Sequence, residues 1–182
     1  RDLVVARVPM TTVPDGISVY GPDGRRVKAQ LQGYKGGVAE ILFTAEVDPV
    51  SYSVFEVRNG GQSSSALKAS QRSLENRIYR IRLDEQGNIA SIVDKRYGRE
   101  LVKSGAAIRL ALFTENKSYE WPAWEILKET VDARPETVAG NVKITIEEVG
   151  PVRASLRVER SYGDSHFVQI ISLTDGAQDD RI

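Results

Sequence analysis

The sequence contains no cysteine and only one histidine, His166, and these two shortages exclude several kinds of chemistry. Without thiols the chain can form no disulfide framework and offers no cysteine nucleophile. A zinc site takes three or four Cys, His or carboxylate ligands, so one histidine argues against a zinc site built from this chain. The sequence has no Gly-x-Ser-x-Gly elbow either, so we expect no serine–histidine catalytic triad.

Neither sign of charge dominates, because 25 Lys and Arg residues balance 25 Asp and Glu residues. A nucleic-acid-binding protein needs a basic face, so we expect no nucleic-acid partner. No apolar run approaches the ~20 residues of a membrane-spanning helix, so we expect no membrane partner. The absence of cysteine fits a cytoplasmic protein, which is the location we expect. The chain begins at Arg1 without Met, so we expect a piece of a longer polypeptide.

Long amphipathic helices are also lacking, and strand signals recur about every ten residues. Residues 142–146 and 152–158 alternate between apolar and polar side chains, as strands with one buried face do. The only helix signal, at residues 123–128, is weak. The sequence therefore predicts an all-β protein built from antiparallel β-sandwiches.

Residues 59–72 differ from the rest, because they are small, polar and rich in Gly and Ser. Such composition is typical of a linker. We therefore predict a small β-sandwich domain over residues 1–59, a linker over 60–72, and part of a larger β-sandwich over 73–182. The last region opens with a predicted β-meander, in which Gly-containing turns at 84–88 and 94–98 separate short strands.

One aromatic cluster lies in an irregular segment: Tyr119, Trp121 and Trp124, with Glu125 beside them. Aromatic faces stack on the apolar faces of sugars and carboxylates accept hydrogen bonds from hydroxyl groups, so the cluster is a candidate substrate-binding site. In the alternative interpretation, both tryptophans fill the sandwich core. The sequence leaves both open.

The acidic residues offer no catalytic pair that the sequence can identify. A glycosidase needs two carboxylates on either side of the sugar bond. Glu147 and Glu148 are neighbours in a predicted strand, so their side chains point to opposite faces unless a bulge intervenes.

Several stretches, in order, resemble glycoside hydrolase family 38, the α-mannosidases. Residues 74–101, LENRIYRIRLDEQGNIASIVDKRYGREL, are similar to the start of the family's large C-terminal β-sandwich. Residues 123–126 are similar to its DAWDI motif, with Pro122 and Glu125 in place of the two Asp residues. Further similar stretches are FTAEVDPVSYSVF at 43–55, where Ser51 replaces the usual Gly, GPVRA at 150–154, QIISL at 169–173 and DRI at 180–182.

This resemblance implies a retaining, zinc-dependent α-mannosidase whose zinc ion and Asp nucleophile lie in an N-terminal domain. None of that domain's motifs is present, so the resemblance implies no catalytic residue, no metal ligand and no cofactor in this chain, with zinc in the missing catalytic domain. Residues 73–182 would begin a galactose-mutarotase-like sandwich. The implied partners are the missing catalytic domain and a mannoside carbohydrate, with Trp124 as the best candidate for sugar contact, followed by Trp121 and Tyr119.

Two alternatives to this support role remain. The chain could be a free-standing carbohydrate-binding module that uses Trp121 and Trp124, or a purely structural β protein with buried tryptophans. Because an incomplete sandwich exposes sheet edges, we also expect a homo-oligomer or reduced stability.

Overall fold

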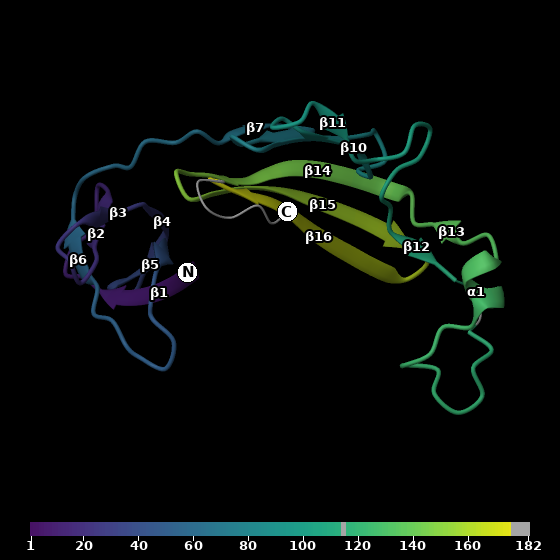
Figure 1. The fold of residues 1–182 in the computed structure, drawn as a ribbon, viewed down its shortest axis with the longest axis horizontal. Helices are drawn as coiled ribbons and strands as arrows, with labels where there is room; N and C mark the ends of the chain where they lie inside the picture. The colour runs from purple at the N-terminus through teal and green to yellow at the C-terminus, as the bar shows by residue number, and fades with distance from the viewer. Residues whose placement is uncertain (114–115, 176–182) are drawn as a thin grey trace.

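The computed structural model describes residues 1–113 and 116–175, and nearly all of its regular structure is antiparallel β-sheet (Figure 1). The predicted all-β class is therefore confirmed. Residues 180–182, the last stretch that resembles the family, lie outside the described residues. No helix in the described part of the chain is long and apolar enough to cross a membrane.

The N-terminal part of the chain forms two three-stranded sheets around one core. The first sheet has the order β1-β5-β4 and the second has the order β3-β2-β6. Their buried side chains include Val19, Ile41 and Phe43, and the rings of Phe43 and Phe55 lie 5.2 Å apart. The strands are β1 (Asp2–Pro9), β2 (Ile17–Tyr20), β3 (Arg26–Val27), β4 (Ala29–Lys35), β5 (Val38–Ala45) and β6 (Glu56–Asn59).

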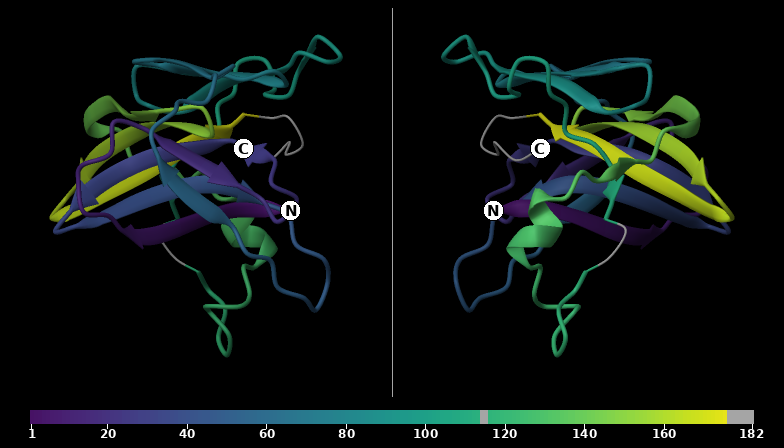
Figure 2. Two further views of the ribbon diagram at one scale, coloured as in Figure 1. Left: turned by 90° about the vertical axis from the view of Figure 1, so that its left-hand side faces the viewer. Right: turned by 90° about the vertical axis from the view of Figure 1, so that its right-hand side faces the viewer.

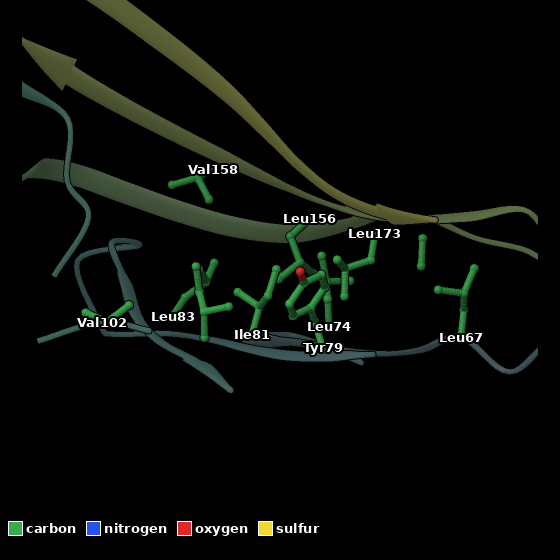
Figure 3. Close-up of a cluster of buried hydrophobic side chains, with 11 residues drawn as sticks. Leu67, Leu74, Tyr79, Ile81, Leu83, Val102, Leu156, Val158 and Leu173 are labelled. Atoms are coloured by element: carbon green, nitrogen blue, oxygen red, sulfur yellow. The ribbon is translucent and has the colours of Figure 1, made fainter. Parts of the chain in front are cut away.

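Most of the remaining strands form two sheets that enclose a second core. One has five strands in the order β11-β10-β9-β8-β7 and the other has the order β14-β15-β16. Figure 3 shows Leu74 and Ile81 of the first sheet facing Leu156 and Leu173 of the second. The strands are β7 (Lys68–Ser70), β8 (Ser73–Glu75), β9 (Tyr79–Leu83), β10 (Ile89–Asp94), β11 (Arg99–Glu100), β14 (Gly140–Val149), β15 (Arg153–Tyr162) and β16 (Ser165–Thr174).

Alternation in the sequence explains why these strands pack in this way. In β9, Tyr79, Ile81 and Leu83 are buried while Arg80 and Arg82 are exposed. Side chains of a strand point alternately to opposite faces, so one face of β9 joins the core and the other meets water. The predicted meander is confirmed, since β9, β10 and β11 are consecutive neighbours in one sheet.

The structure differs from the sequence prediction in its single helix and near the linker. The weak helix signal at 123–128 does not coincide with the observed helix: Leu127 has extended backbone, and α1 spans Lys128–Asp132. Residues 68–70, placed in the predicted linker, form β7 because the preceding Leu67 is buried in the second core. Before the helix, β12 (Ala111–Leu112) is short and pairs with β13 (Glu136–Thr137), which follows the helix.

A set of polar groups joins the two cores. The buried Gln30 of β4 accepts hydrogen bonds at Oε1 from the backbone N–H groups of Val152 (3.2 Å) and Arg153 (3.0 Å). Its Nε2 donates to Glu148 Oε2 at 2.8 Å. We call Gln30, Glu148, Gly150, Val152 and Arg153 the polar junction. It attaches β4 to the turn between β14 and β15.

The close fit at this turn depends on glycine. A Cβ added to Gly150 would lie 2.1 Å from Gln30 Cδ, well inside the contact distance of two carbon atoms. The carbonyl of Gly150 also accepts a hydrogen bond from Ser65 Oγ at 3.1 Å. Nearby, Lys28 Nζ forms an ion pair with Asp175 Oδ2 at 2.7 Å. These contacts fix the turn against the first sheet.

Candidate functional site

The aromatic side chains singled out in the sequence lie on a loop between β12 and α1. This aromatic loop (residues 116–127) extends away from the sheets (Figures 1 and 2). Tyr119 is 97% exposed, Trp121 60% and Trp124 88%. The interpretation in which both tryptophans fill the sandwich core is therefore wrong, and the purely structural alternative loses the buried tryptophans that it predicted.

Hydrogen bonds within the loop fix its shape. Asn116 Nδ2 donates to the carbonyls of Pro122 (2.9 Å) and Glu125 (2.7 Å). The hydroxyl of Ser118 donates to Glu125 Oε2 at 2.7 Å. Thr130 of α1, which is buried, donates from Oγ1 to Asn116 Oδ1 at 3.5 Å. Asn116 thus connects both ends of the loop to the helix, so the aromatic side chains are presented by an organised backbone.

The two indoles belong to one turn of the loop. The carbonyl of Trp121 accepts hydrogen bonds from the backbone N–H groups of Trp124 and Glu125, both at 2.9 Å. The two tryptophans are therefore the first and last residues of one turn. An exposed pair of indoles beside a carboxylate can stack on the apolar face of a sugar ring while the carboxylate accepts hydroxyl hydrogen bonds.

Possible metal ligands do not gather in one place in the part of the chain that the structure describes. Among residues 1–113 and 116–175, no group of three or more His, Cys, Asp or Glu side chains is placed to hold a metal ion. His166 is exposed on β16, in register with Ser161 of β15.

The acidic pair considered in the sequence has a different role. A register shift does lie between Ile146 and Glu148, so a bulge interrupts the alternation of β14. Glu148 accepts hydrogen bonds from Gln30, Gln32 and the guanidinium of Arg153, whereas Glu147 is exposed. Glu148 is therefore a structural acceptor of the polar junction, and sequence reasoning missed it because its amide partners lie on a distant strand.

Glu100, a carboxylate whose pKa is strongly lowered, lies in the meander and not in the aromatic loop. The hydroxyl of Ser91 donates to Glu100 at 2.6 Å, and the backbone N–H groups of Val102 and Ile92 donate at 3.0 and 2.8 Å. Because all three donors favour the charged form, they lower the pKa of Glu100 to about 2. The carboxylate of Glu100 thus connects β10 with the residues around β11 and stabilises the meander.

The second part of the chain is similar to a known protein family. The family model described as "Glycosyl hydrolases family 38 C-terminal domain" matches residues 74–182. A search of curated proteins gave no match. Among solved structures, the chain is similar to an alpha-mannosidase from Enterococcus faecalis V583, with a TM-score of 0.48 and 17% sequence identity. That match covers 87% of this chain but 22% of the other, so the chain spans less than a quarter of that protein's length.

Proposed function

The chain belongs to glycosyl hydrolase family 38 through its C-terminal domain, residues 74–182, and on this premise we propose that it is the non-catalytic β part of an α-mannosidase-like enzyme. The family membership confirms the resemblance seen in residues 74–101. The proposed whole enzyme is a retaining, zinc-dependent glycoside hydrolase. The described residues do not offer the ligand set that zinc needs, so the metal would belong to a catalytic domain outside this chain.

The proposed domain organisation keeps the predicted division into two sandwiches but moves one boundary. Residues 1–59 form the small sandwich, 60–66 the connection, and 67–182 the first part of a larger, mutarotase-like sandwich, because Leu67 is buried in the second core and Lys68–Ser70 form β7. The two separate hydrophobic cores support this division. The polar junction supports a role as a scaffold, because it holds the two parts in one orientation against a catalytic domain. We also propose a cytoplasmic location, supported only by the absence of cysteine.

The exposed aromatic loop is the observation that carries the proposed contribution to substrate binding. Exposed apolar side chains that gather in one place commonly mark an interaction site, and here three exposed aromatic side chains share one organised loop. We propose that Trp124, with Trp121 and Tyr119, borders the mannoside site of the whole enzyme. Loops fixed on a rigid β scaffold are common places for such contacts.

The test compares this chain with the longer polypeptide that contains it. We expect hydrolysis of p-nitrophenyl α-mannoside by the longer polypeptide, loss of that activity with a metal chelator, and no hydrolysis by the 182-residue chain. Zinc-dependent hydrolysis by the 182-residue chain alone would overturn the non-catalytic assignment. A longer polypeptide without any α-mannosidase activity would overturn the enzyme assignment.

A second candidate function is a free-standing carbohydrate-binding module, which the exposure of both tryptophans favours. Trp121 and Trp124 are the only tryptophans in the chain, so its indole fluorescence reports on the aromatic loop alone. A titration of the 182-residue chain with methyl α-mannoside separates the two functions. A saturable fluorescence change in the isolated chain supports the function as a free-standing module. If the fluorescence does not change, the isolated chain does not bind the sugar, and the aromatic loop would contact sugar only within the assembled enzyme.

A further inference from the structure

A hollow of about 520 Å³ opens on the outward face of the sheet formed by β1, β5 and β4. Arg7 of β1, Glu40 of β5 and Gly33 of β4 are paired across this sheet in one row. Residues paired in this way direct their side chains to the same face. A Cβ at Gly33 would meet no atom within 4 Å, so the glycine leaves open space at the end of the row.

The backbone of β4 is irregular at this glycine. The pairing of β4 with β5 shifts its register between Leu31 and Gly33, so Gln32 is the extra residue of a bulge. Bulges are common beside binding sites, where they redirect a side chain, and a glycine inside a strand often marks a place where a ligand approaches the backbone. Gly33 has neither a positive φ nor a close neighbour that would require glycine. Open space for a ligand is the role that is left.

The hollow lies beside the polar junction. Gln30 and Leu42 form the next row on the same face of the sheet and are buried, and Gln30 bonds to the turn between β14 and β15. Gln32, which lines the hollow, donates from Nε2 to Glu148 Oε2 of β14 at 2.9 Å. One wall of the hollow is therefore held by the second core. Small-molecule sites occur preferentially where two domains meet.

The other walls carry hydrogen-bonding groups of both signs. Arg7 Nε bonds to Glu40 Oε2 at 3.1 Å, so the terminal N–H groups of Arg7 and Oε1 of Glu40 can bond to a ligand. Val38 and Lys35 are paired in the row that follows, and they add an apolar surface and an exposed ammonium group. The hollow thus offers a carboxylate acceptor, two cationic donors and an amide around an apolar patch.

We propose that this hollow binds one sugar unit of a carbohydrate. A sugar hydroxyl both donates and accepts hydrogen bonds, so it suits a site that holds donors and acceptors side by side. Two neighbouring hydroxyls match the paired oxygens of a carboxylate or the paired N–H groups of a guanidinium. The apolar C–H face of the ring can rest on Val38. An anion suits the hollow less well, because Glu40 repels it and neutralises Arg7.

This site goes beyond the proposed function, because it is separate from the aromatic loop. In Figure 1, β4 and the segment that leads into α1 lie at opposite ends of the molecule. The proposal depends on the side chains of the hollow and not on the α-mannosidase assignment. Both tryptophans lie in the aromatic loop, so their indole signals report on that loop and the two sites can be followed separately.

The test is a titration of the 15N-labelled 182-residue chain with methyl α-mannoside, methyl α-glucoside and methyl β-galactoside, followed by NMR. We expect at least one of these sugars to shift the backbone amide signals of Lys35 and Glu40 in a saturable way. Gly33→Leu fills the hollow and should raise the dissociation constant at least about tenfold. If Gly33→Leu does not fold, Glu40→Gln makes the same test by removing the charged acceptor. Glu46→Gln, at an exposed position just after β5, is the matched control.

Three results would overturn the proposal in the 182-residue chain. They are no shift of these amides with any of the sugars, a shift that Gly33→Leu and Glu40→Gln leave unchanged, and a saturable shift with inorganic phosphate in place of the sugars. In the longer polypeptide, saturation transfer to the bound sugar should fall when Gly33 is replaced by Leu. Unchanged transfer there would show that another part of the polypeptide fills the hollow, which also overturns the proposal.

Discussion

Gln30 and Glu148, 118 residues apart in the sequence, form a 2.8 Å hydrogen bond between the two cores. The same carboxamide accepts from two backbone N–H groups, so one uncharged side chain satisfies three partners at the turn between β14 and β15. Buried polar groups stabilise a fold when all their hydrogen bonds are made and destabilise it when one partner is removed. The polar junction therefore makes the relative placement of the two sandwiches sensitive to single substitutions.

Replacing Gly150 by Ala is expected to lower the free energy of unfolding by about 1–3 kcal/mol, because the new methyl group would overlap Gln30. Urea denaturation followed by circular dichroism measures the change. Gly33→Ala is the matched control, since a Cβ at Gly33 meets no atom within 4 Å. Equal stability of Gly150→Ala and the unchanged chain would contradict the tight contact.

Replacing Gln30 by Leu is expected to cost about 1–3 kcal/mol, because the buried N–H groups of Val152 and Arg153 lose their acceptor. We expect the two sandwiches to become less coupled, so that denaturation by heat broadens or divides into two transitions in calorimetry. Gln62→Leu, at an exposed position outside any strand, should leave the transition unchanged. A single unshifted transition in Gln30→Leu would show that the junction does not couple the cores.

The stability of the meander should depend on acid through Glu100. The folded pKa of about 2 lies below the ordinary value of 4.5, so this group stabilises the fold fully above pH 4.5 and progressively less as the pH falls toward 2. Glu100→Gln should flatten that part of the stability profile, measured by urea denaturation between pH 6 and pH 3 (about the range in which the carboxyl would titrate). Glu85→Gln, at an exposed turn position, is the control. A profile for Glu100→Gln that parallels the original would argue against the lowered pKa.

If the proposed α-mannosidase assignment holds, Trp124→Ala in the longer polypeptide is expected to raise KM for an α-mannoside by up to about tenfold with a smaller change in kcat, because an aromatic contact contributes about 0.5–1.5 kcal/mol. Steady-state kinetics measures both constants. Tyr52→Ala removes an equally exposed aromatic ring from the first core's region and should change neither. An unchanged KM in Trp124→Ala would show that this side chain of the aromatic loop does not contact the substrate.

Much of the fold could be predicted from the sequence because strand alternation is a local signal. The alternation of Tyr79, Ile81 and Leu83 with two arginines predicts the buried face of β9 from five residues alone. The Gly-containing turns that follow predict where the chain reverses. The family resemblance of residues 74–101 also depends on one continuous stretch of sequence. Neither the strand prediction nor the family resemblance requires knowledge of contacts with distant segments.

The orientation of the aromatic side chains could not be predicted, because composition does not separate a tryptophan that fills a core from one on an exposed loop. The deciding contacts are the two hydrogen bonds of the Asn116 amide, whose partners lie six and nine residues later. The helix was misplaced for a related reason, since the turn at Trp121 and the extended Leu127 divide a segment that propensity alone treats as continuous.

The acceptor role of Glu148 was missed because it depends on pairing over long sequence distances. The β14 bulge gives no sequence signal, and Gln30 and Gln32 lie on another sheet. Gln30 gives no local signal either, because it alternates with Ala29 and Leu31 as a polar residue on the outward face of a strand does.

The separation of the junction residues along the chain has a consequence for the order of folding. Contacts between residues far apart in sequence form only after the intervening loop has been closed, at an entropic cost. Gln30 leaves the ribosome long before Arg153, so the first sandwich can assemble while the carboxamide of Gln30 is still bound to water. The polar junction is then completed only when the β14–β15 hairpin has formed, which makes attachment of the two sandwiches a late event in synthesis.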